Sequence, residues 1–179
     1  MALKTLPPRA LLRELLDYDV PTGNFIWRPR PRDMFRNEQN FRLWNTRYAG
    51  KIAGGTRGGK QPYLYIAVHH TQYFAHRLVW LYVHGDPVPN VIDHIDGNPL
   101  NNRFSNLRAC SKAQNCANQR LRDSNTTGVR GVVRRNGRFQ AQIMVNFKTH
   151  YLGRFDTLEE AAKARYDAAI RLYGAFAKH

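Results

Sequence analysis

The stretch from residue 138 to residue 145 alternates between apolar side chains and mostly long polar ones, and this period of two restricts the fold more than any other feature. The apolar members are Phe139, Ala141, Ile143 and Val145, and the others are Arg138, Gln140, Gln142 and Met144. Successive side chains of a strand point to opposite faces, so the pattern predicts a strand with one apolar face and one exposed face.

The residues around this strand predict a small sheet with one helix. Asn136-Gly137 is typical of a tight hairpin turn from a preceding strand, and residues 150–155 predict a third strand. Thr157 and Glu160 have the spacing of a capping box, which predicts that a helix begins there. We therefore expect a domain of three antiparallel strands and one helix over residues 124–179.

Residues 1–60 predict a basic N-terminal arm with a short helix and a hairpin. Residues 10–16 have the spacing of a short amphipathic helix, and a turn at residues 19–23 leads into a strand at residues 24–27. The stretch from there to residue 60 is rich in Arg, Asn and Gly, so we expect irregular, mobile structure that clings to DNA. The alternative is a solvated loop that keeps the protein soluble.

Residues 61–123 predict a unit of strands followed by a helix. The pattern indicates strands at residues 63–68 and 73–75 and a helix at residues 76–84. Three residues of that helix fall at intervals of four on one face: His76, Trp80 and His84. Histidines beside a buried tryptophan pack more often than they bind metal, so packing is the preferred interpretation and a metal site the alternative.

The charge of the chain restricts its partner. The 179 residues include 28 Lys and Arg against 13 Asp and Glu, a formal net charge of +15, which favours nucleic acid or an anionic membrane face. The basic residues of 28–47 and 120–155 are mixed with aromatic and turn residues, a pattern that favours nucleic acid over a membrane-surface helix. No apolar run approaches the roughly 20 residues that cross a bilayer.

Three polar segments follow one another between residues 91 and 115. They are Val91-Ile92-Asp93-His94-Ile95-Asp96-Gly97-Asn98, Asn101-Asn102-Arg103-Phe104-Ser105-Asn106-Leu107-Arg108 and Ser111-Lys112-Ala113-Gln114-Asn115. Their order and spacing resemble the HNH endonuclease family, in particular the phage and intron homing endonucleases in which asparagine replaces the final histidine. The resemblance implies a ββα-metal (His-Me finger) core that hydrolyses phosphodiester bonds in double-stranded DNA.

The same resemblance implies roles for single residues. His94 would be the general base that takes a proton from the attacking water, and Asn106 would hold His94, through its side chain or its backbone, in its useful orientation and tautomer. Asp93 and Asn115 would supply oxygens to one divalent cation, Mg²⁺ or Mn²⁺, leaving sites for phosphate and water. We assign Asp96 to the turn. The histidine at position 76 is treated as structural or close to phosphate.

Residues from about 127 to 177 resemble a second module, the APETALA-type DNA-binding domain of plant ethylene-response factors. The resemblance lies in Arg130-Gly131-Val132, in Tyr151-Leu152-Gly153-Arg154-Phe155-Asp156-Thr157 and in Glu159-Glu160-Ala161-Ala162-Lys163-Ala164-Arg165-Tyr166-Asp167. In that family the exposed face of the sheet lies in the major groove. The resemblance implies DNA contacts from Arg130, Arg135, Arg138, Gln142, Tyr151 and Arg154. We add Gln140, which the alternation directs outward, and Lys148, which lies in the next predicted turn; the alternative is a solvated sheet face.

Together these features predict an α+β chain, a ββα-metal nuclease core followed by a three-stranded antiparallel sheet packed on one helix. The leading hypothesis is a site-directed DNA endonuclease of homing type that acts as a monomer, without a membrane partner, in the cytoplasm (of the host cell if a phage encodes it). A double-strand break would need two engagements or a dimer, and nicking stays open as the other outcome. The alternative function is a non-catalytic, sequence-specific DNA-binding regulator with a decayed nuclease core.

Overall fold

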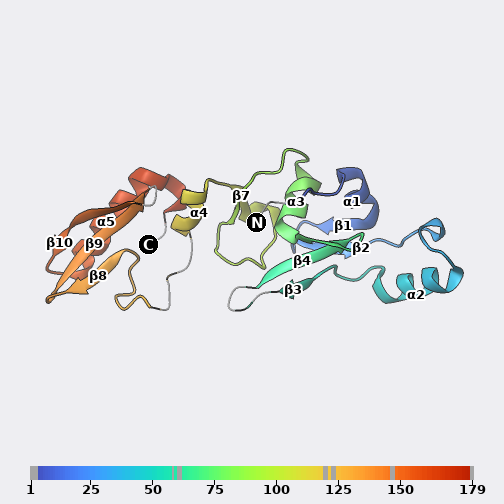
Figure 1. The fold of residues 1–179 in the computed structure, drawn as a ribbon, viewed down its shortest axis with the longest axis horizontal. Coiled ribbons are helices and arrows are strands. Elements are labelled where there is room, and N and C mark those ends of the chain that lie inside the picture. Colours follow the sequence, from blue (N-terminus) through green and yellow to red (C-terminus); the bar gives the residue numbers. More distant parts are fainter. Residues whose placement is uncertain are drawn as a thin grey trace. The chain divides into compact units, whose positions relative to one another are not determined.

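The structure, a computed structural model, describes residues 4–57, 59, 62–118, 121, 124–145 and 148–177 (Figure 1). It divides into two compact units, Met1–Ala109 and Cys110–His179, and each is described by itself. The domain boundaries predicted after residues 60 and 123 differ from this division, and residues 60, 61 and 123 lie outside the described residues.

The first unit begins with a helix and a hairpin, as the sequence predicts. Helix α1 (Arg9–Leu15) leads directly into strand β1 (Leu16–Asp19), which pairs antiparallel with β2 (Asn24–Trp27). The helix ends one residue earlier than predicted because Leu16 has extended backbone angles and starts the strand. The apolar side chains of this segment, namely Leu12, Leu15, Leu16 and Phe25, are buried in the core of the unit.

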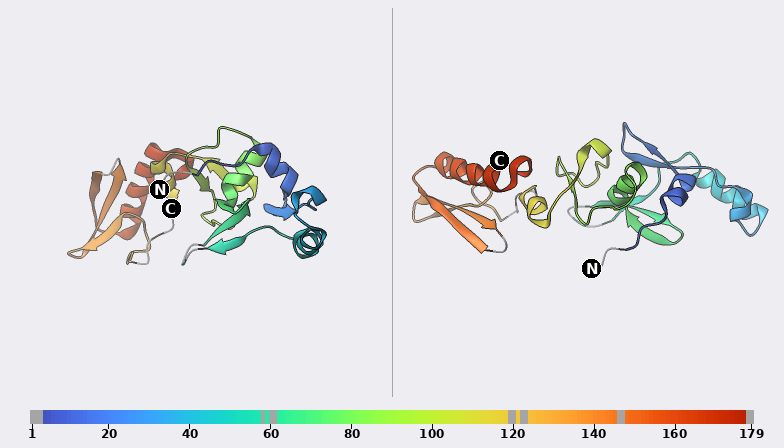
Figure 2. Two further views of the ribbon diagram at one scale, coloured as in Figure 1. Left: turned by 45° about the vertical axis from the view of Figure 1, so that its right-hand side comes forward. Right: turned by 90° about the horizontal axis from the view of Figure 1, so that it is seen from above.

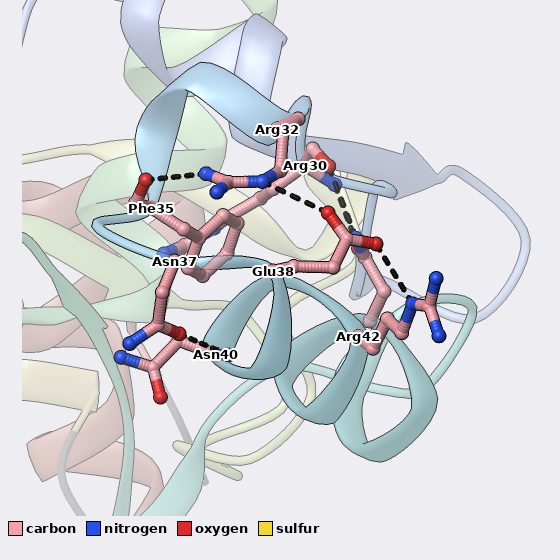
Figure 3. Close-up of polar contacts among 8 residues, drawn as sticks. Arg30, Arg32, Phe35, Asn37, Glu38, Asn40 and Arg42 are labelled. Carbon is pink, nitrogen blue, oxygen red and sulfur yellow. Dashed lines mark hydrogen bonds and ion pairs between the residues drawn. The ribbon is translucent and has the colours of Figure 1, made fainter.

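The prediction of irregular structure up to residue 60 is wrong for its middle part. A short 3-10 helix η1 (Arg32–Met34) is followed by an eleven-residue helix α2 (Glu38–Tyr48). The side chain of Asn37 caps this helix by accepting a hydrogen bond from the Asn40 backbone N–H at 2.8 Å (Figure 3). Aromatic side chains at helical spacing pack it against residues before the helix, a tertiary contact that overrides a composition rich in Arg and Asn.

A three-stranded antiparallel sheet follows, in the order β3 (Gly55–Arg57), β4 (Tyr63–Val68) and β5 (Thr71–Phe74). The second of these strands has the predicted bounds. The third begins two residues earlier than predicted, because His69 and His70 both have positive φ and make a two-residue turn. Helix α3 (Ala75–Val83) comes next and places Leu78, Val79 and Leu81 in the core of the unit.

The first unit ends in a hairpin with a long loop. Strand β6 (Ile92–His94) pairs antiparallel with β7 (Leu107–Ala109), and the 3-10 helix η2 (Phe104–Asn106) precedes the second strand. The register places Asp93 opposite Arg108. Upstream of the hairpin, the buried guanidinium of Arg77 donates a 2.8 Å hydrogen bond to the carbonyl of Pro89 and so ties α3 to the approach to β6.

The second unit contains helix α4 (Lys112–Asn118), a three-stranded antiparallel sheet and a long helix. The sheet has the order β10 (Lys148–Phe155), β9 (Arg138–Val145) and β8 (Val132–Arg135), and α5 (Leu158–Tyr173) and the 3-10 helix η3 (Gly174–Phe176) follow. The predicted Asn136-Gly137 turn is confirmed, since both residues have positive φ between β8 and β9. The predicted capping box of Thr157 and Glu160 is also present.

Helix α5 lies along one face of this sheet (Figure 2). Its alanines Ala161, Ala168 and Ala169 are buried against Val132, Ala141 and Ile143. Small side chains allow the helix to approach the strands closely, and the polar residues of the opposite face of the sheet are exposed or half-buried. Among the described residues, no helix combines the length and the apolar character needed to cross a membrane.

Candidate active site

Strand β6 carries the two residues on which the predicted chemistry depends. Asp93 and His94 are 4% and 7% exposed, so both side chains are withdrawn from bulk water. The carboxylate of Asp93 accepts a 2.9 Å hydrogen bond from Nε of Arg108, its cross-strand neighbour. A buried carboxylate therefore has a charged partner on the same hairpin, and the cost of burying both charges is reduced.

The imidazole of His94 is oriented by Asn102, which sequence reasoning did not single out as a site residue. Nε2 of His94 lies 3.3 Å from Oδ1 of Asn102, and Nδ2 of Asn102 donates to the carbonyl of Leu100 at 3.1 Å. Because the amide nitrogen has its own acceptor, Oδ1 faces the histidine and Nε2 is the protonated ring nitrogen. This tautomer leaves the lone pair on Nδ1.

Burial lowers the pKa of His94, although the bond to Asn102 and the nearby carboxylates of Asp96 and Asp93 act in the opposite direction. The histidine is therefore neutral around neutral pH. A neutral imidazole with a fixed tautomer has the properties that a general base requires.

His76 lies against this histidine. The two rings meet edge to face at 5.2 Å between centroids, and the His76 ring also stacks on Phe74 at 5.3 Å. Burial, followed by repulsion from His94 and Arg77, lowers the pKa of His76 to about 3. The His76 ring is therefore neutral and packs beside the candidate base, which fits the structural role expected for this position.

Asn106 holds the loop that follows His94. Its Oδ1 accepts from the Asp96 backbone N–H at 3.1 Å, and its Nδ2 donates to Oδ1 of Asp96 at 3.0 Å and to the carbonyl of Asn101 at 2.8 Å. Its own carbonyl accepts from the Ile95 N–H at 2.9 Å. These bonds position the loop around His94, and the predicted role of Asn106 in orienting the histidine stays a prediction.

Asp96 belongs to the turn, as expected. Its carboxylate accepts hydrogen bonds from the Asn98 backbone at 2.8 Å, from Nδ2 of Asn101 at 2.8 Å and from Asn106. Burial raises the pKa of Asp96, but these hydrogen bonds outweigh burial and the pKa is lowered. The Asp96 carboxylate therefore stays ionised, and its hydrogen bonds hold the backbone of the loop in place.

The β1–β2 hairpin holds the same loop from the other end of the sequence. The hydroxyl of Tyr18 donates to the carbonyl of Asn102 at 3.0 Å and accepts from the Phe104 N–H at 2.8 Å. Gly23 has a φ of +76°, and a Cβ at this position would lie 2.3 Å from the backbone nitrogen of Arg103. The guanidinium of Arg103 in turn donates to the carbonyl of Pro21. No local pattern marks Tyr18, because its partners lie 84 and 86 residues away.

Asn115 lies in α4 of the second unit, and its backbone N–H donates to the carbonyl of Ser111 at 3.0 Å. Ser111 and Gln114 cap this helix reciprocally, with bonds of 3.1 Å and 2.8 Å. The division between Ala109 and Cys110 separates Asn115 from Asp93, so their joint binding of a cation stays a prediction.

Within the part of the chain that the structure describes, no three His, Cys, Asp or Glu side chains gather at a metal-binding distance. The packing interpretation of the α3 face is confirmed for its last two members, since His84 stacks on Trp80 at 5.2 Å and meets Phe104 at 5.0 Å. A cation at the β6–β7 hairpin would rest on few protein oxygens, with Asp93 as the hard anionic donor.

The predicted DNA-binding residues divide into two groups. By strand register, six of the eight lie on the sheet face opposite α5: Arg135, Arg138, Gln140, Gln142, Tyr151 and Arg154. Two apolar side chains, Val133 and Met144, share that face and are also exposed. Arg138 pairs with Asp156, and Arg154 donates to the carbonyls of Arg135 and Asn136 at 3.4 Å.

The other two predicted residues lie elsewhere. Arg130 precedes β8, and its guanidinium donates to the carbonyl of Cys116 in α4 at 3.2 Å. Lys148 is the first residue of β10 and pairs with Val145, so the alternation assigns it to the side of the sheet that faces α5. The expectation that Lys148 lies in a turn is therefore wrong.

One family model and two relatives match part of this chain. The sequence model of the HNH endonuclease family matches residues 73–117. An uncharacterized HNH endonuclease, L560, of Acanthamoeba polyphaga mimivirus is 36% identical over 104 residues, which is 57% of this chain and 54% of that protein. Protein 3.8 of Escherichia phage T7 is 36% identical over 107 residues, which is 58% of this chain and 87% of that protein.

Proposed function

We propose that this chain, whose residues 73–117 match the HNH endonuclease domain, is a metal-dependent endonuclease that hydrolyses phosphodiester bonds in double-stranded DNA. One observation carries the proposal. A neutral, buried histidine, His94, has its Nε2 bonded to Asn102 and follows a buried carboxylate, Asp93, on the same short strand. A neutral base can take a proton from water, and an anionic oxygen can bind the cation that stabilises the phosphate.

His94 acts as the general base through Nδ1. Water attacks phosphorus while Nδ1 takes its proton, and the Nε2–H···Oδ1 bond to Asn102 keeps the ring in place as it becomes positively charged. Asn106 keeps the following loop, and therefore Asn102, in register. General bases contribute about 10²- to 10⁴-fold to such reactions.

Asp93 and Asn115 are the proposed ligands of one cation, Mg²⁺ or Mn²⁺. The donor set fits a hard cation, because a buried carboxylate and an amide carbonyl are oxygen ligands and leave positions for phosphate and water. When bound, the cation neutralises charge that develops on the phosphate and the leaving 3′ oxygen. Arg108 shares the Asp93 carboxylate, so we expect weak affinity for free cation and tighter binding once DNA is present.

The second unit is proposed to read the target. Its exposed sheet face combines arginine and glutamine with Tyr151, and these side chains can reach base edges and phosphates in the major groove. Such a module joined to a nuclease is consistent with a homing-type, site-directed enzyme that works in the cytoplasm. Val133 and Met144 are apolar side chains of this face and cannot form hydrogen bonds with bases. We therefore expect a target different from that of the plant domains.

The test is incubation of the full-length protein with plasmid carrying its neighbouring genomic DNA, with Mg²⁺, with Mn²⁺ or with EDTA. We expect metal-dependent cleavage that His94→Ala abolishes without loss of DNA binding. A strand-resolved map of the products distinguishes nicks from double-strand breaks. Tight sequence-dependent binding with no cleavage by the unmutated protein would refute the enzyme and support the regulator.

A further inference from the structure

Helix α2 extends from the first unit (Figure 1) and is held by packing against residues that precede it. The rings of Trp27 and Trp44 meet edge to face at 5.7 Å, and Phe35 lies 6.2 Å from Trp44. Arg30 lies with its guanidinium 3.9 Å from the Trp44 centroid, and Asn45 bonds both the backbone N–H and the carbonyl of Arg30, at 2.9 and 3.0 Å. The helix is therefore held by the packing of Trp44 on Trp27 and Phe35 and by the hydrogen bonds between Asn45 and Arg30.

The chain beyond the helix also returns to the core. The backbone of Trp27 accepts from the Gly50 N–H at 2.8 Å and donates to the carbonyl of Lys51 at 2.9 Å, and Ile26 forms a bridge with Ile52. The C-terminal end of α2 is thus anchored on β2. A surface presented by this helix has a defined position relative to the β6–β7 hairpin of the same unit.

The outward face of α2 carries two arginines, and the carboxylate of Glu38 lies at its edge beside one of them. Five residues at spacings of three and four are all exposed: Gln39, Arg42, Leu43, Thr46 and Arg47. Residues 28–57 contain eight Lys and Arg against two acids, Asp33 and Glu38. A helix that lies on a membrane needs a broad apolar face, whereas Leu43 is the one apolar side chain among these five.

Glu38 restrains two of the arginines. Its carboxylate accepts from Nε of Arg42 at 2.7 Å and from Nε of Arg32 at 2.9 Å, so it lies between them (Figure 3). Arg42 and Arg47 are five residues apart, about 7.5 Å along the helix axis and about 140° around it. Their long, exposed side chains therefore leave the helix in different directions and can contact separate phosphates.

We propose that the outward face of α2 binds the sugar-phosphate backbone of the DNA substrate, with Arg42 and Arg47 on phosphates and Glu38 limiting the reach of Arg42. The proposal rests on the proposed function, because it adds a second DNA contact to the nuclease. It is independent of sequence readout, since backbone contacts position a protein without reading bases.

The experiment measures binding of the full-length protein to a random-sequence duplex in EDTA, by fluorescence anisotropy over a series of KCl concentrations. We expect Arg42→Gln/Arg47→Gln to weaken binding about tenfold or more at low salt and to reduce the slope of log K against log salt by about 1.8, the value for two lost phosphate contacts. The matched control, Lys163→Gln/Arg171→Gln, removes two charges from the exposed side of α5 and leaves the slope unchanged.

Two further variants sharpen the result. Arg42→Lys/Arg47→Lys keeps both charges and is expected to restore the slope, which separates lost phosphate contacts from a damaged helix. Glu38→Gln releases Arg42 and is expected to tighten binding. Equal slopes for the Gln double variant and its control would overturn the proposal. Because binding in EDTA needs no catalysis, absence of cleavage would refute the enzyme and leave this measurement intact.

Discussion

Two hairpins in this protein have the same antiparallel pairing and opposite uses of their polar side chains. In the β6–β7 hairpin, Asp93 and His94 are buried and bonded to neighbouring residues. In the β8–β9 hairpin, Arg135 and Arg138 are exposed on either side of a two-residue turn. The first is built like a site for proton transfer and the second like a surface for contact.

The difference lies in what surrounds each turn. The loop between β6 and β7 is bonded internally by Asn106 and externally by Tyr18, whereas a Cβ at Gly137 of the second hairpin would meet nothing within 4 Å. Proton transfer by His94 needs one tautomer and one ring orientation, and burial protects both from solvent. Contact with a polyanion needs exposed charge, and rigidity matters less.

The largest effect is expected from Gly23→Ala, which disrupts the packing of the β1–β2 hairpin against the β6–β7 loop. The new Cβ would lie 2.3 Å from the Arg103 backbone nitrogen and would force a left-handed φ of +76° on alanine. We expect a loss of about 3 kcal/mol in the free energy of unfolding. All three tryptophans of the chain lie in the first unit, so urea denaturation followed by tryptophan fluorescence reports this unit.

The matched controls have the same backbone strain without the clash. Gly50 in the first unit and Gly137 in the second have φ of +75° and +77°, and nothing lies within 4 Å of a Cβ at either position. Gly50→Ala should cost about 1 kcal/mol by the same fluorescence measurement, and Gly137→Ala should leave that signal unchanged. If Gly23→Ala costs no more than Gly50→Ala, the β1–β2 hairpin does not hold the active-site loop.

Asn102→Ala is expected to have the next largest effect, on cleavage rather than on binding. The variant removes the acceptor for Nε2 of His94 and the donor to Leu100. We expect the cleavage rate at saturating DNA to fall about 10- to 100-fold with little change in Kd. The bond to Asn102 raises the pKa of His94, so its loss should also move the acid limb of the rate profile to lower pH.

A purely structural role for Asn102 would give a different pattern. It would reduce the amount of folded protein and leave the pH profile of the remaining activity in place. Asn102→Gln offers a conservative comparison, because it keeps the amide but displaces it by one methylene. An unshifted acid limb in Asn102→Ala would exclude the proposed orientation of His94.

How far the sequence predicts this molecule depends on whether the deciding contacts are local. The Asn136-Gly137 turn and the Thr157–Glu160 capping box were predictable, because each depends on residues a few positions apart. Helix α2 was not, because packing on Trp27 decides it against an unfavourable composition. The same holds for Tyr18, whose bonds cross 84 residues or more.

The candidate site divides in the same way. The motif placed Asp93 and His94 on one hairpin, and the structure agrees. It assigned the orientation of the histidine to the side chain or backbone of Asn106, and the structure adds Asn102, four residues earlier, whose side chain meets Nε2. Spacing marks which polar residues belong to the loop, but the fold of the loop decides which of them reaches the ring.

The third prediction concerns the stability of the first unit against acid. The pKa of His76 is lowered to about 3 and that of His94 is also lowered, so each takes up its proton at a lower pH in the folded state than in the unfolded chain. The unfolded chain takes up protons near pH 6.5, and the free energy of unfolding should therefore fall as pH decreases below this value. Each histidine contributes up to about 1.4 kcal/mol per pH unit.

His76→Phe keeps an aromatic ring beside His94 and removes one titrating group. Between pH 6.5 and 4.5 its unfolding free energy, followed by tryptophan fluorescence, should vary less steeply with pH than that of the unmutated protein. The same steepness in both proteins would show that His76 is solvated and protonated in the folded state, contrary to its packing on Phe74 and His94.

The smallest effect is expected from Arg135→Gln, on the second hairpin. Arg135 is exposed and one residue from the turn, so its loss should leave unfolding unchanged within about 0.5 kcal/mol. If it contacts a phosphate, affinity for DNA should fall a few-fold and the salt slope by about 0.9, while the cleavage rate at saturating DNA stays the same. A base contact would instead relax the sequence preference at one position with little change in slope.

Either result keeps the two hairpins distinct, because changes in the β6–β7 hairpin alter the cleavage rate and changes in the β8–β9 hairpin alter binding. A fall in the cleavage rate at saturating DNA would break that distinction and place the sheet face in the catalytic step.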